Sequence, residues 1–184
     1  MRVIAGSLKG RRLKAPTWEG LRPTSDQLRE TLFNILGARI PGARVLDGYA
    51  GTGAVGIEAL SRGAAAVTFV EQDRRARALI AENLALCGVA SGYAIIDTSA
   101  LRAFRELHAR GAVFDLVLLD PPYADNDTQI TALLTESVAI LAPEGLVVLE
   151  HARRRQLPPP AGPLVQTRIV AAGDSALAFY ACQP

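Results

Sequence analysis

The feature that most constrains the fold is an alternation of short apolar runs with longer amphipathic segments between residues 45 and 149. The apolar runs predict strands, and the segments between them keep helical spacing at residues 54–62, 74–87, 101–110 and 130–141. The predicted strands lie at residues 45–47, 67–70, 93–96, 116–119 and 146–149. Strands that are apolar throughout and separated by helices indicate a parallel sheet covered on both faces. With right-handed crossovers, the chain is expected to form a doubly wound α/β domain.

The two ends of the chain depart from this alternation. Residues 165–171 and 176–181 predict a closing antiparallel hairpin, a common addition to a parallel sheet. Residues 1–20 alternate short apolar and basic pieces and predict a small hairpin or an irregular arm. We therefore expect a basic extension of residues 1–40, packed on a domain of residues 41–184.

A helix is expected within this extension. Thr24 is followed three residues later by Gln27, which matches a capping box, and apolar residues then keep helical spacing up to Gly37. Glycine is common just after the last helical residue, so the helix is expected to end there.

Composition excludes several classes of protein. With 184 residues and 49% hydrophobic content, the chain can bury a good core, and it lacks the low hydrophobicity of a disordered chain. No stretch reaches the roughly 20 apolar residues of a membrane helix. Basic residues from Lys9 onward come too early for a signal peptide, so we expect a cytoplasmic protein. Cys87 and Cys182 are isolated, so no metal site is expected.

The formal charge of +2 is unevenly distributed. Residues 1–30 contain seven basic and three acidic residues, so this segment carries +4 and the remaining chain −2. A cationic arm on a slightly acidic body is typical of a protein that contacts a phosphate backbone. The candidate RNA-binding residues are Arg2, Lys9, Arg11, Arg12, Lys14, Arg22, Thr24 and Arg29.

A glycine-rich loop follows the first predicted strand. Residues 51–56 match the pattern G-x-G-x-x-G and open a helix, and Glu71 ends the next strand about 20 residues later. In this context the glycines allow close approach to a nucleotide and the acid binds ribose hydroxyls. Asp97 or Ser99, after the third strand, is expected to contact the adenine. The cofactor-binding candidates are Asp47, Gly48, Tyr49, Ala50, Gly51, Gly53, Glu71, Gln72, Asp97, Ser99 and Asp120.

Asp47 favours S-adenosylmethionine over a dinucleotide as the cofactor. This residue ends the first strand, so its carboxylate is expected at the mouth of the cofactor site. An anion there would repel a pyrophosphate at the helix N-terminus, but it would attract the amino group of S-adenosylmethionine. A dehydrogenase also normally needs a substrate domain for which the chain has no room. An NAD-binding oxidoreductase remains the alternative from another class.

The segment Asp120-Pro121-Pro122-Tyr123 ends the fourth strand and supplies the candidate catalytic residues. In open α/β sheets, ligands bind outside these carboxyl ends. The two prolines remove two N–H donors, which leaves the Asp120 carboxylate and the Pro121 carbonyl as acceptors. Two acceptors can hold the two N–H bonds of an exocyclic amine and expose its lone pair to a methyl donor. Tyr123 can stack on the base, which must be unpaired or flipped out.

Other polar residues carry a weaker signal. Glu150 and His151 end the fifth strand at the edge of the same site, and the basic run at residues 153–155 fits either a solvated loop or a phosphate contact. The sequence leaves their roles open.

Over almost its whole length the chain resembles the bacterial RsmD-type 16S ribosomal RNA (guanine-N2)-methyltransferases. The Arg-Pro-Thr segment and the helix after it are the part most specific to that family. The resemblance rests on residues 2–6, 9–11, 21–24, 29–34, 46–53, 56–63, 70–73 and 120–123.

This resemblance implies a class I methyltransferase fold with a seven-stranded sheet and a reversed last strand. It further implies S-adenosyl-L-methionine as cofactor and methyl transfer to N2 of one guanine in 16S rRNA, within the assembled or assembling small subunit. A monomer is expected. An adenine-N6 methyltransferase acting on RNA or DNA, and a non-catalytic RNA-binding assembly factor, remain alternatives.

Overall fold

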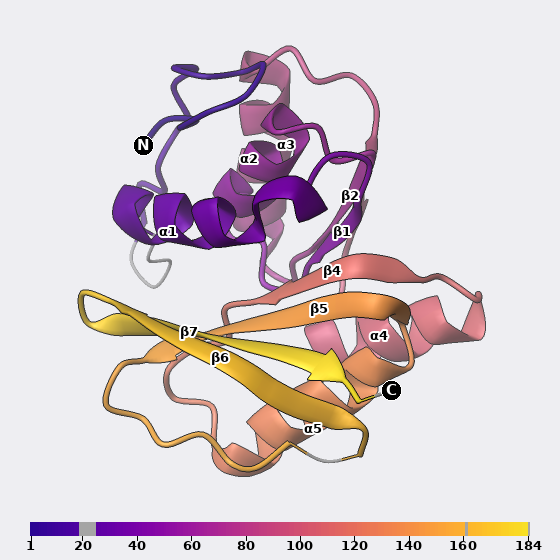
Figure 1. The fold of residues 1–184 in the computed structure, drawn as a ribbon. Coiled ribbons are helices and arrows are strands. Elements are labelled where there is room, and N and C mark those ends of the chain that lie inside the picture. The colour runs from indigo at the N-terminus through magenta and orange to yellow at the C-terminus, as the bar shows by residue number, and fades with distance from the viewer. Residues whose placement is uncertain (19–24, 161, 184) are drawn as a thin grey trace.

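A seven-stranded sheet forms the centre of the molecule, in the order β3-β2-β1-β4-β5-β7-β6 (Figure 1). The computed structural model describes residues 1–18, 25–160 and 162–183. The first five strands in the chain are parallel, and β7 runs antiparallel to both β5 and β6. This confirms the doubly wound α/β fold with an antiparallel C-terminal hairpin. The strands are β1 (Arg44–Asp47), β2 (Ala66–Val70), β3 (Tyr93–Ile96), β4 (Phe114–Leu119), β5 (Leu141–Ala152), β6 (Leu164–Ala172) and β7 (Ser175–Cys182).

Helices cover both faces of the sheet. One buried cluster joins one face to α1 (Asp26–Leu36), which is followed by the short turn η1 (Gly37–Arg39), and to α2 (Ala54–Ser61) and α3 (Arg74–Leu86). A second cluster joins the other face to α4 (Ala100–Ala109) and α5 (Asp127–Val138), and Figure 1 shows these two helix layers on opposite sides of the strands. None of the helices within the described ranges is long and apolar enough to cross a membrane.

The strand order fixes where a ligand can bind. From β1 the chain builds the sheet outward through β2 and β3, and it then returns to place β4 on the other side of β1. The helices that follow β1 and β4 therefore leave in opposite directions, which opens a crevice at the carboxyl ends of these two strands. The glycine-rich loop follows β1, and the segment Asp120–Tyr123 follows β4, so the topology brings both motifs to this crevice.

Buried polar side chains hold the N-terminal extension on the core. Residues 1–13 fold back on themselves as one antiparallel bridge between Arg2 and Arg12. Glu58 of α2 accepts hydrogen bonds from the backbone N–H groups of Ile4 (2.7 Å) and Ala5 (3.0 Å). Asn83 of α3 accepts from Lys14 N–H at 2.7 Å and donates to the backbone carbonyls of Lys14 and Thr52. The extension is thus fixed by hydrogen bonds to two core helices.

Several element boundaries differ from those expected, among them those of α1, α5 and β5. The N-cap of α1 is Ser25, whose hydroxyl accepts from Leu28 N–H, and not Thr24; Arg22 and Thr24 lie outside the described residues. Helix α5 begins at Asp127, because Asn126 and Gln129 form a capping box, and it ends at Val138. The apolar residues at 140–141, expected at the end of this helix, instead lead into β5.

Candidate active site

A cavity of about 240 Å³ lies at the carboxyl ends of the parallel strands. It combines apolar walls with carboxylate and hydroxyl groups, as expected of a site for a small polar ligand. Its lining includes five predicted cofactor-binding residues and Pro122 of the catalytic segment. The lining residues are Gly48, Tyr49, Val70, Glu71, Gln72, Thr98, Ser99, Ala100, Leu101, Pro122, Asp125, Gln129 and Leu133.

The glycine-rich loop needs its glycines for two different reasons. Gly53 has a φ of 77°, a left-handed conformation that favours glycine. Gly56 has no such φ, but a Cβ there would lie 2.2 Å from a ring carbon of Phe69 in β2. Gly53 lets the loop turn into α2, and Gly56 lets α2 approach the sheet closely. The close approach expected of these glycines was to a nucleotide, whereas Gly56 allows the close packing of α2 on β2.

Glu71 connects the two loops that border the cavity. Its carboxylate accepts hydrogen bonds from Gly51 N–H (2.9 Å) and Asp73 N–H (2.8 Å), so it holds the glycine-rich loop against the end of β2. Arg77 braces the same segment by donating to the backbone carbonyls of Glu71 and Gln72. The helical pattern of the sequence does not reveal this contact of Arg77 with the preceding loop.

The expected position of Asp47 at the mouth of the site is wrong. This residue is buried, its carboxylate accepts from Gly56 N–H at 3.1 Å, and it does not line the cavity. Since β1 is central in the sheet, its last residue lies beneath the glycine-rich loop. Burial is the main cause that raises the pKa of Asp47 to about 7; the charges of Asp120 and Glu71 act in the same direction. Asp47 therefore lies beneath the glycine-rich loop and holds it through the hydrogen bond from Gly56 N–H.

The raised pKa of Asp47 predicts a pH dependence of stability. Between pH 4 and pH 7 the native state holds a proton on Asp47 that the unfolded chain has released, so the free energy of unfolding falls as the pH rises through this window. The contribution of Asp47 to this slope reaches about 1.4 kcal/mol per pH unit. Asp47→Asn should remove it, because an amide does not titrate. Urea unfolding of both proteins at pH 4.5, 6.0 and 7.5 measures the difference, and equal slopes would contradict the assignment.

The loop after β3 settles which of two candidates faces the cavity. Ser99 lines it, together with Thr98, whereas Asp97 forms an ion pair with Arg77 at 2.6 Å and is not part of the lining. The sequence did not identify the opposite wall, which comes from the loop and first turns of α5. The sequence signal for this wall was Gln129, because it belongs to the capping box that sets where α5 starts. The wall residues that the sequence missed are Asp125, Gln129 and Leu133.

The segment Asp120–Tyr123 lies beside this cavity. Asp120 is half-buried, and its charge is close enough to raise the pKa of Asp47. Pro121 is buried and Pro122 lines the cavity, which fixes the backbone between the two acceptors and the aromatic ring. Tyr123 has 51% of its surface exposed, an unusual position for an aromatic side chain that serves only the core. The segment thus presents acceptors and a ring at the edge of the cavity.

The predicted RNA-binding residues divide into exposed and buried groups. Arg2, Lys9, Arg11, Arg12 and Lys14 are exposed on the extension, and Lys14 pairs with Glu82 of α3. These five residues stay candidates for phosphate contacts.

The assignment of Arg29 to RNA is corrected by its burial. Its side chain is fully buried and donates to the backbone carbonyls of Arg2 (2.8 Å) and Ala54 (3.3 Å) and to the carboxylate of Asp26 (2.6 Å). It faces inward because it lies on the apolar side of α1, between Leu28 and Leu32. Arg29 therefore joins the extension to the first turn of α2.

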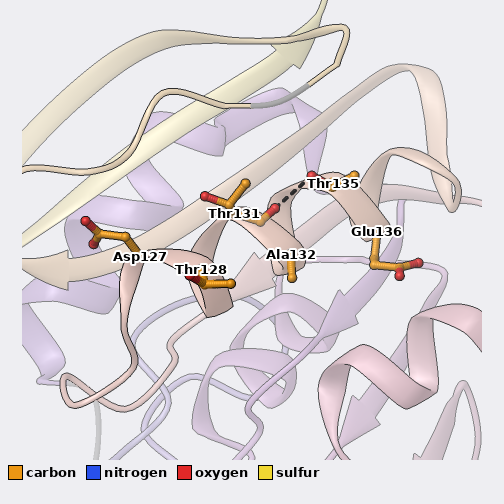
Figure 2. Close-up of a pocket in the computed structure, with 6 residues that line it drawn as sticks. All are labelled: Asp127, Thr128, Thr131, Ala132, Thr135 and Glu136. Carbon is orange, nitrogen blue, oxygen red and sulfur yellow. Dashed lines mark hydrogen bonds between the residues drawn. The ribbon is translucent and has the colours of Figure 1, made fainter.

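A larger hollow of about 530 Å³ lies along α5, away from the glycine-rich loop. Figure 2 shows that one helix supplies the labelled side chains, with the Thr135 hydroxyl donating to the backbone carbonyl of Thr131. It contains neither the loop residues nor the acceptor segment. We therefore take the smaller cavity as the candidate active site, because Gly48 and Tyr49, which lead into the glycine-rich loop, and Pro122 of the acceptor segment line it.

Comparisons with known proteins agree with this fold. A family model described as "Conserved hypothetical protein 95" matches residues 1–181. YlbH of Bacillus subtilis is 38% identical over 98% of both chains. The Escherichia coli K12 protein named "Ribosomal RNA small subunit methyltransferase D" is 40% identical over 86% of this chain and 78% of its own.

The fold is also matched by a solved structure of a related protein. The structure of yhhF from Escherichia coli superposes with a TM-score of 0.82 at 35% identity, covering 100% of this chain and 99% of that one. The sequence and structural matches both extend through the N-terminal extension as well as the sheet. The chain therefore belongs to the Conserved hypothetical protein 95 family, that of the ribosomal RNA small subunit methyltransferase D proteins.

Proposed function

We propose that the protein transfers a methyl group from S-adenosylmethionine to the exocyclic N2 amine of a guanine in 16S rRNA of the small ribosomal subunit. The observation that carries the proposal is the position of the segment with two hydrogen-bond acceptors, the Asp120 carboxylate and the Pro121 carbonyl, next to Pro122 in the lining of a cavity of about 240 Å³ at the switch point of the sheet. Family membership supports rRNA as the substrate.

The residues around the cavity fit the parts of S-adenosylmethionine. Glu71 offers carboxylate oxygens where ribose hydroxyls would donate, as acids at this position do in nucleotide-binding folds. The side chains of Val70, Leu101 and Leu133 offer an apolar wall for the adenine, with Ser99 at its edge. The glycine-rich loop allows close approach of the remaining methionine portion. When bound, this cofactor supplies a methyl group on a positively charged sulfur.

The chain's own residues prepare the amine. The lone pair of N2 is delocalised into the guanine ring, so the free amine is a poor nucleophile. Asp120 and the Pro121 carbonyl accept its two N–H bonds, which favours a pyramidal nitrogen with its lone pair directed away from the acceptors. The reaction then depends on positioning and on the negative charge near the developing cation. The methylated amine releases its proton to Asp120 or to water.

The extension supplies the RNA contact in this proposal. Its exposed cations, from Arg2 to Lys14, are fixed to α2 and α3 and so keep a set position relative to the site. A guanine inside a duplex cannot reach the acceptors, so the target must be unpaired or flipped out. We expect a monomer that acts on the small subunit or on its assembly intermediate.

The decisive experiment is tritiated methyl transfer to small subunits from a strain that lacks the modification, followed by mapping of the labelled base. Label on N2 of one guanine in 16S rRNA is the expected result. Label on adenine N6 would instead indicate an adenine methyltransferase, and binding of subunits without transfer would indicate an assembly factor.

Thermal shift measurements test the cofactor separately. S-adenosylhomocysteine at 100 times its Kd should stabilise the protein by about 2.7 kcal/mol, because it binds only the native state. NAD at the same concentration should have no effect. Stabilisation by NAD alone would contradict the methyltransferase proposal.

A further inference from the structure

The hydroxyl group of Tyr123 is tied to the neighbouring strands, although the ring itself is exposed. It lies 2.8 Å from Oγ of Ser175, the first residue of β7. The Ser175 hydroxyl in turn donates to Oε1 of Glu150 in β5 at 3.0 Å. Three side chains from the β4–α5 connection, β7 and β5 thus form one chain of hydrogen bonds.

The direction of these bonds follows from the number of protons. A serine hydroxyl has one hydrogen, and the Glu150 carboxylate can only accept, so this hydrogen points to Glu150. The Ser175 oxygen must therefore accept from the Tyr123 hydroxyl. A carboxylate at the end polarises both bonds and strengthens them relative to an isolated pair of hydroxyls.

Ser175 and Glu150 form a rigid anchor. Glu150 pairs opposite Leu177, and Ser175 pairs opposite Ala152, so the two side chains are diagonal neighbours on one face of the antiparallel β5–β7 pair. Glu150 is almost fully buried, and Ser175 also pairs with Ala172 of β6. The anchor is built into the sheet, whereas Tyr123 belongs to a loop.

We propose that Ser175 and Glu150 are positioning residues for base binding, acting through Tyr123. The inference rests on the proposed function. Pro121 and Pro122 fix the backbone on one side of Tyr123, and the anchor fixes its hydroxyl at the far end of the ring. A ring held at both ends is a preorganised stacking surface. The target base that stacks on it is therefore held at a fixed position relative to the two acceptors.

Activity measurements on single and double variants test this coupling. Tyr123→Phe keeps the ring and removes the hydroxyl, and Ser175→Ala removes its acceptor. Each should lower kcat/KM for the RNA substrate about 3- to 10-fold, the worth of one hydrogen bond. The double variant should lose no more than either single variant, because both break the same contact. Glu150→Gln should have a smaller effect, since an amide oxygen still accepts from Ser175.

Controls separate positioning from folding and from the cofactor. S-adenosylhomocysteine affinity and thermal stability should stay close to wild type in these variants, because neither Tyr123 nor Ser175 lines the cavity. Tyr93→Phe, which changes an exposed tyrosine on β3, should leave kcat/KM unchanged. Unchanged turnover in both single variants, or losses that multiply in the double variant, would overturn the inference.

A readout on the free protein keeps the test independent of the proposed function. With 3-fluorotyrosine incorporated, the fluorine resonance of Tyr123 should shift in Ser175→Ala, while that of Tyr93 should not. If the wild-type protein transfers no methyl group, the proposed function fails, and this spectrum still decides whether the anchor holds the ring. An unshifted resonance of Tyr123 would show that no anchor exists.

Discussion

Replacing Asp120 with alanine is expected to lower kcat for methyl transfer by about 10²- to 10³-fold, the usual cost of removing one preorganised group at a developing charge. The carboxylate is one of two acceptors available to the amine, so its removal leaves one N–H bond of the amine without a partner. The affinity for S-adenosylhomocysteine should change little, because Asp120 does not line the cavity. Single-turnover methyl transfer and calorimetric titration of the cofactor product measure the two quantities.

Two further variants make this result specific. Asp120→Asn keeps one carbonyl oxygen as acceptor but loses the charge, so its kcat should lie between those of the wild type and the alanine variant. Asp115→Ala removes a carboxylate from the same strand, where it pairs with Arg44 on the surface, and it should leave kcat unchanged. Turnover of Asp120→Ala within a fewfold of wild type would rule out the acceptor role.

The sheet and its main helices could be predicted from the sequence because local signals agree there. Apolar strands such as residues 93–96 are bounded by turn residues, and the predicted range is the one that the structure shows for β3. The start of α5 was missed because its signal is the polar pair Asn126 and Gln129, which lies before the apolar pattern begins. The local residue pattern therefore predicted which helices and strands form better than it predicted where each of them begins and ends.

The site was only partly predictable, because the position of a residue relative to a sequence motif does not reveal whether its side chain is buried or exposed. The residues at the strand ends were found by their order along the chain, and Glu71, Gln72 and Ser99 line the cavity as expected. Asp47 was expected at the mouth of the site because it ends β1, and Arg29 was expected to contact RNA because it belongs to the basic extension. Both are buried, because a central strand and the apolar side of a helix place them inside, where backbone N–H and carbonyl groups serve as partners.

Glu58→Ala is expected to cause the largest loss of stability among single substitutions on the extension side of the molecule. Glu58 is fully buried, and besides the N–H groups of Ile4 and Ala5 it accepts from Arg62 Nε at 2.7 Å. Alanine would leave these donors without their acceptor. Breaking a buried ion pair by removing one partner costs about 3–5 kcal/mol, so the free energy of unfolding in urea should fall by that amount.

The comparison with an exposed pair tests the cause of this loss. Glu82→Ala removes the partner of Lys14, both of which are about half exposed, and it should cost less than about 1 kcal/mol. Glu58→Gln keeps an amide oxygen that can accept from one of the donors. Its loss of free energy of unfolding should lie between those of these two variants. Since Glu58 holds the cationic arm, the alanine variant should also lose affinity for small subunits more than it loses affinity for S-adenosylhomocysteine. Equal stability losses for Glu58→Ala and Glu82→Ala would mean that the arm is held mainly by its apolar contacts, such as those of Val3 and Leu13 with the core.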